Sequence, residues 1–548
     1  MIAASKPNIV LILTDDQGFD DYGFCQPPLE TPVMDKIMKD GVQFTRFYTA
    51  AACAPTRSAL MTGRNFMRTG TSAVGFGAEA PHLDEYLLSE AMQDAGYVTG
   101  MMGKWNLGLS DADLPSQRGF DEAWPVVRDD VRSYGRYEHF NPPFFHNGSY
   151  AGREDGWQVE RVTDKAIDFI QANQANPFFL YIPYAAPHEP WLCPRDLQEK
   201  YINKGIGEQY AMFLGMMEQL DTQVGRVLQS LEDLGLADDT IVLFFGDNGP
   251  TPTTRILQQD AEGFFSLTTE YYTLNEEEWA ARNPSGFRSK KATGWENALR
   301  NRLSIYSPAM YEPKIIEKMT LVMDIYPTLV ELAGGNRSLD KLPLDGQSLM
   351  PLLSGQTAWP ERGYFTGETG KPEQYLASDG WNYRFTEHAL PLYRRETWFA
   401  GTQGGDVAEL EAIRNDPHAW SDPVQEVRPE AYLEMECVYR FKGKNSVTWA
   451  NTFFHEIGAV QEMKVRVLES GTYQATMRIL GVSEETTLRF SVGEVSKKVK
   501  LASGKKYHNF GTIDLKAGEQ VLAVELLEIG NEKAISKMEL FSMELEKE

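Results

Sequence analysis

The chain opens with a run that sets the expected fold, Pro7-Asn8-Ile9-Val10-Leu11-Ile12-Leu13-Thr14-Asp15-Asp16-Gln17-Gly18. Consecutive apolar residues without alternation are typical of a strand buried on both faces of a parallel sheet. Asp15 and Asp16 then stand at the carboxyl end of that strand, where open α/β sheets bind their ligands. Two adjacent carboxylates repel each other. Solvation in a surface turn would relieve the repulsion, and so would a hard cation.

The same pattern recurs far downstream. Thr240 to Phe245 is a second apolar run, and Gly246-Asp247-Asn248-Gly249 ends it. A single strand end rich in oxygen-bearing side chains is explained by a turn, whereas two such ends on parallel strands indicate a metal site. We therefore expect an α/β domain in which a mostly parallel sheet is sandwiched by helices.

A third stretch predicts a short helix, Cys53-Ala54-Pro55-Thr56-Arg57-Ser58-Ala59-Leu60-Met61-Thr62-Gly63-Arg64. Pro55 suits a first helical turn and Gly63 a stop, which leaves Cys53 at the N-cap. The helix dipole is positive there, and Arg57 points back toward the same end. Such a position suits an anion or an activated thiol, although most free cysteines are small buried hydrophobes.

Together these stretches resemble the signatures of the type I sulfatases, a branch of the alkaline phosphatase superfamily, over roughly residues 7–355. In that family a modifying enzyme oxidises the signature cysteine to formylglycine, so the resemblance implies that Cys53 is the precursor of the catalytic aldehyde and that Arg57 holds it. The resemblance also implies a divalent cation, commonly calcium. Its ligands would be Asp15, Asp16, Asp247, Asn248 and residue 53.

Further site residues follow by the same resemblance. Gly103-Lys104-Trp105-Asn106-Leu107-Gly108 is similar to the second sulfatase signature and places Lys104 on the sulfate group. His188, in Pro187-His188-Glu189-Pro190, is the candidate acid for the departing alcohol. Lys291 matches the family's later lysine, and Lys290 is its competitor.

The chain departs from the family at Asn106, where a histidine is usual. In the family that histidine contacts the formylglycine and helps to deprotonate it when sulfate is expelled. An amide cannot take up a proton near neutral pH. The departure leaves open which group performs this step, and it raises the alternative of a protein that binds sulfated glycans with impaired turnover.

Composition limits the partners. The formal charge is 53 − 78 = −25, which argues against nucleic acid or an anionic membrane. No apolar run approaches the roughly 18 residues of a membrane span. Residues 1–6 lack the apolar region of a signal peptide, so we expect either a cytoplasmic protein or a mature periplasmic or extracellular form whose leader has been removed.

Three domains are expected: a catalytic domain over 1–355, a smaller sheet subdomain over 356–424 and a jelly-roll β-sandwich over 425–548. Such sandwiches often bind carbohydrate, but as often they serve only as packing partners of another domain. The aromatic-rich segment 251–289 favours a pocket wall, with a packed helix over 275–281 as the alternative.

These features favour the hydrolysis of sulfate from a sulfated oligo- or polysaccharide, because sugar rings stack on flat side chains. An arylsulfatase and a phosphate or phosphonate ester hydrolase on the same scaffold are the alternative enzymes. The expected partners are the sulfated carbohydrate and the formylglycine-generating enzyme.

Overall fold

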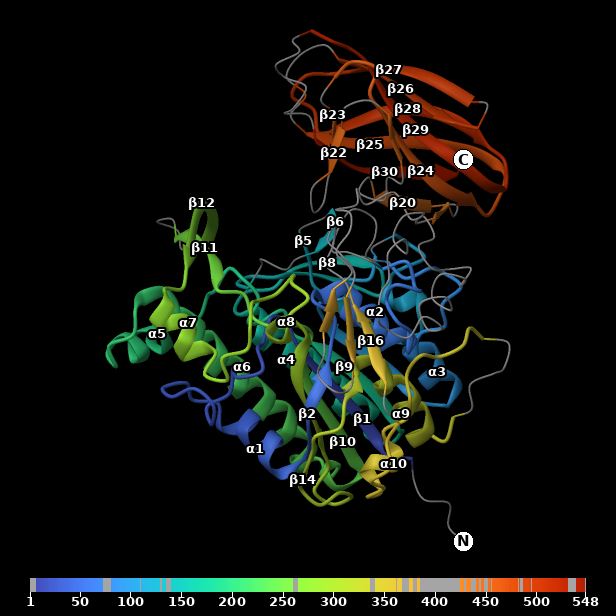
Figure 1. Ribbon diagram of the computed structural model, residues 1–548. Coiled ribbons are helices and arrows are strands. Elements are labelled where there is room, and N and C mark those ends of the chain that lie inside the picture. Colours follow the sequence, from blue (N-terminus) through green and yellow to red (C-terminus); the bar gives the residue numbers. More distant parts are fainter. Residues whose placement is uncertain are drawn as a thin grey trace.

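The computed structural model describes most of the catalytic domain and most strands of the C-terminal domain (Figure 1). The described residues are 6–71, 80–108, 110–128, 131–134, 139–259, 265–335, 341–360, 362–366, 374–377, 382–384, 424–427, 430–434, 440–442, 445–447, 452–454, 456–480, 482, 486–493, 495–530 and 539–547.

A nine-stranded sheet forms the centre of the catalytic domain, and β1 (Asn8–Thr14) lies in its middle. β1 pairs in parallel with β10 (Thr240–Gly246) on one side and with β9 (Phe178–Pro183) on the other. Only β13 (Arg300–Tyr306) runs against its neighbours β10 and β2 (Val42–Tyr48), which confirms the predicted mostly parallel sheet. The remaining strands are β3 (Val98–Gly103), β4 (Glu122–Pro125), β14 (Lys314–Ile316) and β15 (Thr320–Leu321).

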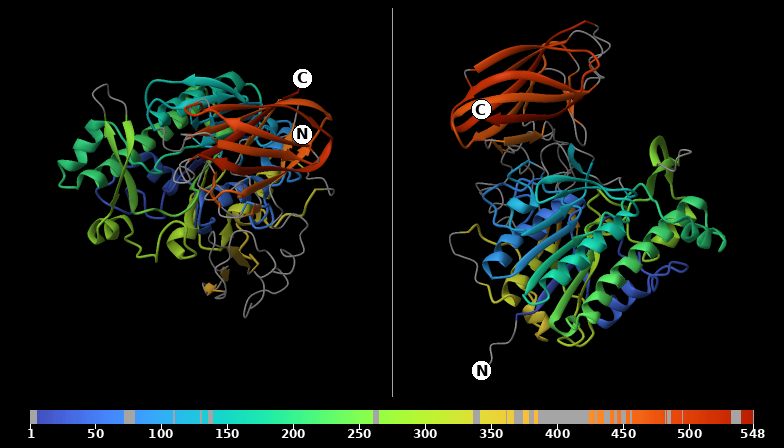
Figure 2. Two further views of the ribbon diagram at one scale, coloured as in Figure 1. Left: turned by 90° about the horizontal axis from the view of Figure 1, so that it is seen from above. Right: turned by 180° about the vertical axis from the view of Figure 1, so that it is seen from behind.

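β1 is buried on both faces, as its apolar run predicts. Ile9, Leu11 and Leu13 belong to one core, shared with α2 (Cys53–Thr62), α3 (Leu88–Asp94) and α9 (Ile325–Leu332). Val10 and Ile12 belong to the opposite core, shared with α1 (Pro32–Asp40), α4 (Gln158–Asn173) and α6 (Glu208–Asp233). The two helical layers lie on opposite faces of the sheet (Figure 2). This burial fixes the strand ends that carry the polar motifs.

Two helix boundaries differ from those predicted. Cys53 is the first residue of α2, and the N-cap is Ala52, while Gly63 adopts the left-handed conformation that ends the helix. Apolar residues at helical spacing over 83–95 predict a second helix, but α3 begins only at Leu88. The Glu90 carboxylate accepts the Leu87 N–H at 2.6 Å, which caps the helix there.

The aromatic-rich segment 251–289 contains a hairpin and a helix, so it is ordered in its described part. β11 (Thr253–Gln259) and β12 (Phe265–Thr273) pair antiparallel and project beside α7 (Glu276–Arg282) (Figure 1). The helix given as the alternative over 275–281 is therefore present, and the pocket wall stays a prediction. Arg282 ties α7 to the loop that follows β1, because its guanidinium pairs with Asp21 at 2.8 Å and both side chains are fully buried.

Two further β units follow. β16 (Gly363–Thr366), β17 (Gln374–Ala377) and β18 (Asn382–Arg384) form a small antiparallel sheet in the expected subdomain, and residues 385–423 lie outside the described ones. Tyr364 is buried in the core of the catalytic domain.

The C-terminal domain is the predicted β-sandwich. Its two sheets are ordered β19-β24-β29-β26-β27 and β22-β23-β30-β25-β28, with β21 and β20 added, and they share one apolar core. The sandwich lies beyond the end of the catalytic domain toward which β1 runs (Figures 1 and 2). Its strands are β19 (Val424–Val427), β20 (Glu430–Glu434), β21 (Arg440–Lys442), β22 (Asn445–Val447), β23 (Thr452–Phe454), β24 (Val460–Val467), β25 (Gly471–Leu480), β26 (Thr486–Val492), β27 (Val495–Leu501), β28 (Tyr507–Leu515), β29 (Gly518–Ile529) and β30 (Glu539–Lys547).

The buried Arg282–Asp21 pair yields a stability prediction. Arg282→Met leaves the Asp21 carboxylate buried without its cation, which costs about 3–5 kcal/mol. Urea unfolding followed by tryptophan fluorescence measures the loss. Arg195→Met, which breaks an exposed pair with Glu199, is the control and costs less than about 1 kcal/mol. Equal losses in the two variants would contradict the structural role given to Arg282.

Candidate active site

Strand pairing brings the two acidic motifs together. Thr14 lies opposite Gly246 in the parallel register, so Asp15 and Asp247 leave the sheet side by side. The Asp247 N–H donates to the Thr14 carbonyl at 2.9 Å, and the Asp16 N–H donates to Asp247 Oδ1 at 3.2 Å. Residues 231 positions apart in the sequence thus form one carboxylate cluster.

Asp16 turns the chain sharply. Its φ of 67° lies in the left-handed region, where Asp and Asn are among the few residues found without glycine's freedom. In this turn Asp16 Oδ1 accepts from Asn248 Nδ2 at 2.8 Å and from Lys291 Nζ at 2.5 Å. The strained backbone therefore brings the motifs at 15–16, 247–248 and 291 into direct contact.

Arg57 joins α2 to this cluster. Its Nε and Nη2 donate to Asp247 Oδ2 at 3.1 and 2.8 Å, and Nη2 also lies 3.2 Å from Asp15 Oδ2. Its Nη1 donates to the Lys104 carbonyl at 2.8 Å. The fully buried guanidinium thus neutralises the carboxylates and fixes the head of α2 against the strand ends. Its contact with a modified residue 53 stays a prediction.

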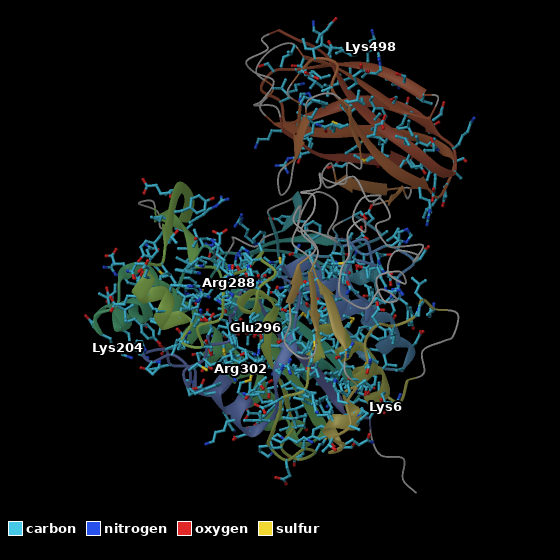
Figure 3. All side chains as sticks on the ribbon, in the orientation of Figure 1. Lys6, Lys204, Arg288, Glu296, Arg302 and Lys498 are labelled. Atoms are coloured by element: carbon cyan, nitrogen blue, oxygen red, sulfur yellow. The ribbon has the colours of Figure 1, made fainter. Side chains whose placement is uncertain are left out.

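Two lysines complete the cluster. Lys104, directly after β3, donates to Asp15 Oδ2, and Lys291 donates to Asp16. Lys290 is exposed, so the structure places Lys291 in the site. The Lys291 N–H donates to the Pro250 carbonyl at 2.9 Å. Farther along the chain Glu296, which is labelled in Figure 3, accepts from Arg300 at 2.9 Å.

The donor set fits a hard cation. Potential ligand atoms of Asp15, Cys53 and Asp247 lie within 4.8 Å of one another, and so do those of Asp15, Asp16 and His188. Three buried oxygens have no hydrogen-bond partner among the described residues: Asp15 Oδ1, Asp16 Oδ2 and Asn248 Oδ1. Leaving such groups unsatisfied costs about 1–3 kcal/mol each. These unsatisfied oxygens suit a hard divalent cation, which prefers oxygen ligands.

Burial and charge oppose each other at these carboxyl groups. Burial alone would raise the pKa of Asp15, but the charges of Lys104, His188 and Arg57 outweigh it and hold that pKa below the usual value. Burial and the charge of Asp15 raise the pKa of Asp247 to about 6. Burial also raises the pKa of the Cys53 thiol, so an unmodified cysteine here is a weak nucleophile.

His188 has a defined orientation. Its Nδ1 lies 2.6 Å from the Glu189 carbonyl, which can only accept, so Nδ1 carries a proton. Its Nε2 lies 3.8 Å from Asp16 Oδ2. A protonated ring would therefore present Nε2–H at the carboxylate cluster, as expected of the predicted acid.

Asn106 and His139 are two further buried polar side chains. Asn106 is 1% exposed, has a φ of 58°, and neither of its amide atoms has a hydrogen-bond partner in the described part of the chain. His139 is 3% exposed, and its Nε2 lies 3.0 Å from the His188 carbonyl. Sequence reasoning did not single out His139, because this residue belongs to none of the motifs from which the site residues were taken.

The cation site gives a testable prediction. We expect calcium to raise the melting temperature of the wild-type protein, because a ligand that binds only the folded state stabilises it. Asp16→Asn keeps a residue tolerant of the left-handed turn but removes a charged ligand, so we expect calcium affinity to fall at least about ten-fold. Titration calorimetry measures the change. Asp168→Asn, on the exposed face of α4, is the matched control. Unchanged affinity in Asp16→Asn would refute the assignment.

The comparisons of the sequence with known proteins agree on one family. The sequence model of the family described as Sulfatase matches residues 7–335. An arylsulfatase of Hemicentrotus pulcherrimus is 30% identical over 66% of this chain and 64% of its own length. Arylsulfatase J of Mus musculus is 27% identical over 64% of this chain and 56% of its own length. The match thus spans less than two thirds of both relatives. N-acetylgalactosamine-6-sulfatase of Homo sapiens is 28% identical over 67% of this chain and 70% of its own length.

Solved structures show the same fold. The structure described as Ps i-CgsB in complex with k-i-k-neocarrahexaose has a TM-score of 0.58 at 22% identity and covers 76% of this chain and 94% of its own. A second, in complex with its substrate D-glucosamine-2-N,6-O-disulfate, has a TM-score of 0.51 at 19% identity and covers 68% and 87%. The expected fold class is therefore confirmed.

Proposed function

The chain belongs to the sulfatase family, and we propose that it removes sulfate from a sulfated oligo- or polysaccharide with a formylglycine at position 53 and one calcium ion. One observation carries the proposal. Cys53, at the first position of α2, lies beside Asp15 and Asp247, whose neighbours Asp16 and Asn248 offer buried oxygens that are otherwise unsatisfied.

The residues divide the chemistry between them. Sulfate esters hydrolyse very slowly, so charge must be stabilised on the equatorial and leaving oxygens, as in phosphoryl transfer. The calcium ion would polarise a sulfate oxygen and favour ionisation of the residue-53 hydroxyl. Lys104 and Lys291 lie beside the carboxylates and supply positive charge to the transferring group. His188 Nε2 gives the proton that the departing alcohol needs.

A carbohydrate substrate is favoured over a small aryl sulfate. N-acetylgalactosamine-6-sulfatase, a relative by sequence, is named for a sulfated sugar. The β11–β12 hairpin supplies a candidate sugar-binding wall, because its base is anchored to the loop that follows His188. The Trp191 N–H donates to Thr254 Oγ1 at 2.9 Å, and the Arg255 N–H donates to Glu189 Oε2 at 3.3 Å. Tyr271 on the hairpin is 56% exposed and offers a flat ring.

The names of two other relatives favour a second candidate, an arylsulfatase. For both candidates the partner is a formylglycine-generating enzyme that oxidises Cys53. A compartment outside the cytoplasm suits a polysaccharide substrate. No helix in the described residues is long and apolar enough to cross a membrane.

Oxidation of Cys53 is the first test. When the chain is produced with the modifying enzyme, we expect mass spectrometry of the peptide that carries residue 53 to show formylglycine. Cys53→Ala lowers sulfate release at least roughly 10⁴-fold, because the nucleophile is lost. Cys25→Ala, at another free cysteine, keeps the wild-type rate. An active Cys53→Ala protein would overturn the proposed chemistry.

Substrate class is the second test. We expect kcat/KM on sulfated oligosaccharides to exceed that on aryl sulfates at least about ten-fold, because contacts beyond the sulfate group add transition-state binding. Paired sulfate and phosphate esters of one alcohol separate a sulfatase from a phosphate ester hydrolase. Sulfate release from aryl sulfates alone would favour an arylsulfatase. Faster release of phosphate than of sulfate would favour a phosphate ester hydrolase.

A further inference from the structure

Arg288 stacks on Trp295, in the loop formed by residues 288–295. The central carbon of its guanidinium lies 3.7 Å from the centre of the Trp295 ring, so the aromatic side chain covers one face of the cation. The N–H groups of a guanidinium lie in its plane and stay accessible at its edge in such a stack. Arg288 is exposed, and no carboxylate pairs with it in the part of the chain that the structure describes. The stack therefore holds a cation ready to bind an oxyanion.

The loop 288–295 also contacts the candidate active site on two sides. Lys291 Nζ donates to Asp16 Oδ1 at 2.5 Å, which joins the loop to the acidic motifs. The Ala292 N–H donates to the Ala51 carbonyl at 2.8 Å, and Ala51 directly precedes the N-cap of α2. The loop thus spans the gap between the acidic motifs and the helix that carries residue 53.

Arg288 lies within reach of a substrate held at Lys291. Only three residues separate the two positions, so their Cα atoms are at most about 11 Å apart. In Figure 3, Arg288 lies nearer to the C-terminal sandwich than Glu296 and Arg302 do. That is the end of the catalytic domain toward which β1 runs. The side chain therefore belongs to the face on which the site opens, at a distance that suits a second group of the same saccharide.

Contacts with buried backbone and side-chain groups fix the shape of this loop. Asn297 is 2% exposed, its Nδ2 donates to the Ser289 carbonyl at 2.8 Å, and its N–H donates to the Arg288 carbonyl at 3.3 Å. Trp295 is the N-cap residue of α8 (Glu296–Leu299). Because the backbone is held at both members of the stacked pair, little conformational freedom is lost when the pair binds a ligand.

The loop carries an excess of positive charge. Lys290 is exposed and, like Arg288, has no carboxylate partner among the described residues. Glu296, the next acidic residue along the chain, already accepts from Arg300 at 2.9 Å. Two uncompensated cations therefore lie beside the site in a chain whose net charge is −25, and such a local field attracts anions.

We propose that Arg288, with Lys290 beside it, binds a second oxyanion of the substrate, a sulfate or a carboxylate on the saccharide that carries the cleaved sulfate. The guanidinium edge can donate two parallel N–H bonds to such a group, and the lysine adds a point charge. The preferred substrate is then a polyanionic carbohydrate, and a singly sulfated sugar is a poorer one. This inference rests on the proposed sulfatase function and narrows its substrate class.

Three disaccharides with the same cleavable sulfate test the inference. The first has no other charge, the second has one more sulfate, and the third has a carboxylate. We expect the wild-type kcat/KM on the second or the third to exceed that on the first at least about ten-fold, because the added contact stabilises the transition state. The disaccharide with the larger ratio identifies the second anion.

Substitution of Arg288 should remove this preference. We expect Arg288→Gln to lower the ratio of the two kcat/KM values at least about ten-fold, and Arg288→Lys to restore part of it, because lysine keeps the charge but not the planar fork. Lys498→Gln, at an exposed lysine of the C-terminal sandwich (Figure 3), removes the same charge and is the matched control with a wild-type ratio. Raising the salt from about 0.05 M to about 0.5 M should weaken the wild-type preference, because exposed charges are screened.

Other results overturn the inference. A wild-type ratio near unity would exclude the second-anion site, and so would a ratio that Arg288→Gln leaves unchanged. An equal loss of kcat/KM on all three disaccharides would show that Arg288 only supports the loop. A wild-type protein that hydrolyses none of the three would instead refute the proposed function.

Binding to an inactive variant decides the question without turnover. Cys53→Ala lacks the nucleophile, and titration calorimetry measures its affinity for each disaccharide. We expect the doubly charged compound that carries the identified anion to bind at least about ten-fold more tightly than the singly charged one. Adding Arg288→Gln should abolish the difference. Equal affinities in Cys53→Ala would overturn the inference whatever the enzyme does to sulfate esters.

Discussion

The whole site depends on burying three carboxylates, with oxygens of Asp15 within 4.8 Å of those of both Asp16 and Asp247. Asp15, Asp16 and Asp247 are each 0–1% exposed, and such a cluster is stable only where cations compensate it. Arg57, Lys104 and Lys291 supply three permanent positive charges from three other parts of the chain. The requirement for compensation thus explains why the motifs at 53–57, 104 and 291 must converge on the ends of β1 and β10.

Local patterns predicted the elements that carry the site. The apolar runs of β1 and β10 need burial on both faces. Each strand is seven residues long, so the local sequence alone is enough to predict it. Their convergence with Lys291, 275 residues from Asp16, came from the resemblance, because no local pattern encodes a contact over that separation. The observed start of α2 differs from the predicted one by a single residue, and that of α3 differs by several residues. Helix ends are hard to predict because capping depends on individual side chains.

What the sequence did not predict depends on tertiary contacts outside motifs. The Arg282–Asp21 pair joins residues 261 positions apart, and the antiparallel course of β13 is decided by its neighbours. His139 is the clearest case. Its burial and its contact with His188 arise from the packing of a loop between strands, so nothing in the residues beside it marks it as part of the site.

Charge balance also bears on how a chain of net charge −25 would bind the proposed sulfate ester. Three carboxylates and three permanent cations cancel, so the cluster by itself gives a sulfate ester no net attraction. The two lysines are moreover engaged by Asp15 and Asp16, the residues that offer unsatisfied oxygens. A divalent cation on those oxygens would compete with the lysine ammonium groups and leave the pocket with two excess positive charges. Cation affinity and sulfate affinity are then coupled through the same carboxylates, and each ligand should tighten the binding of the other by the same factor.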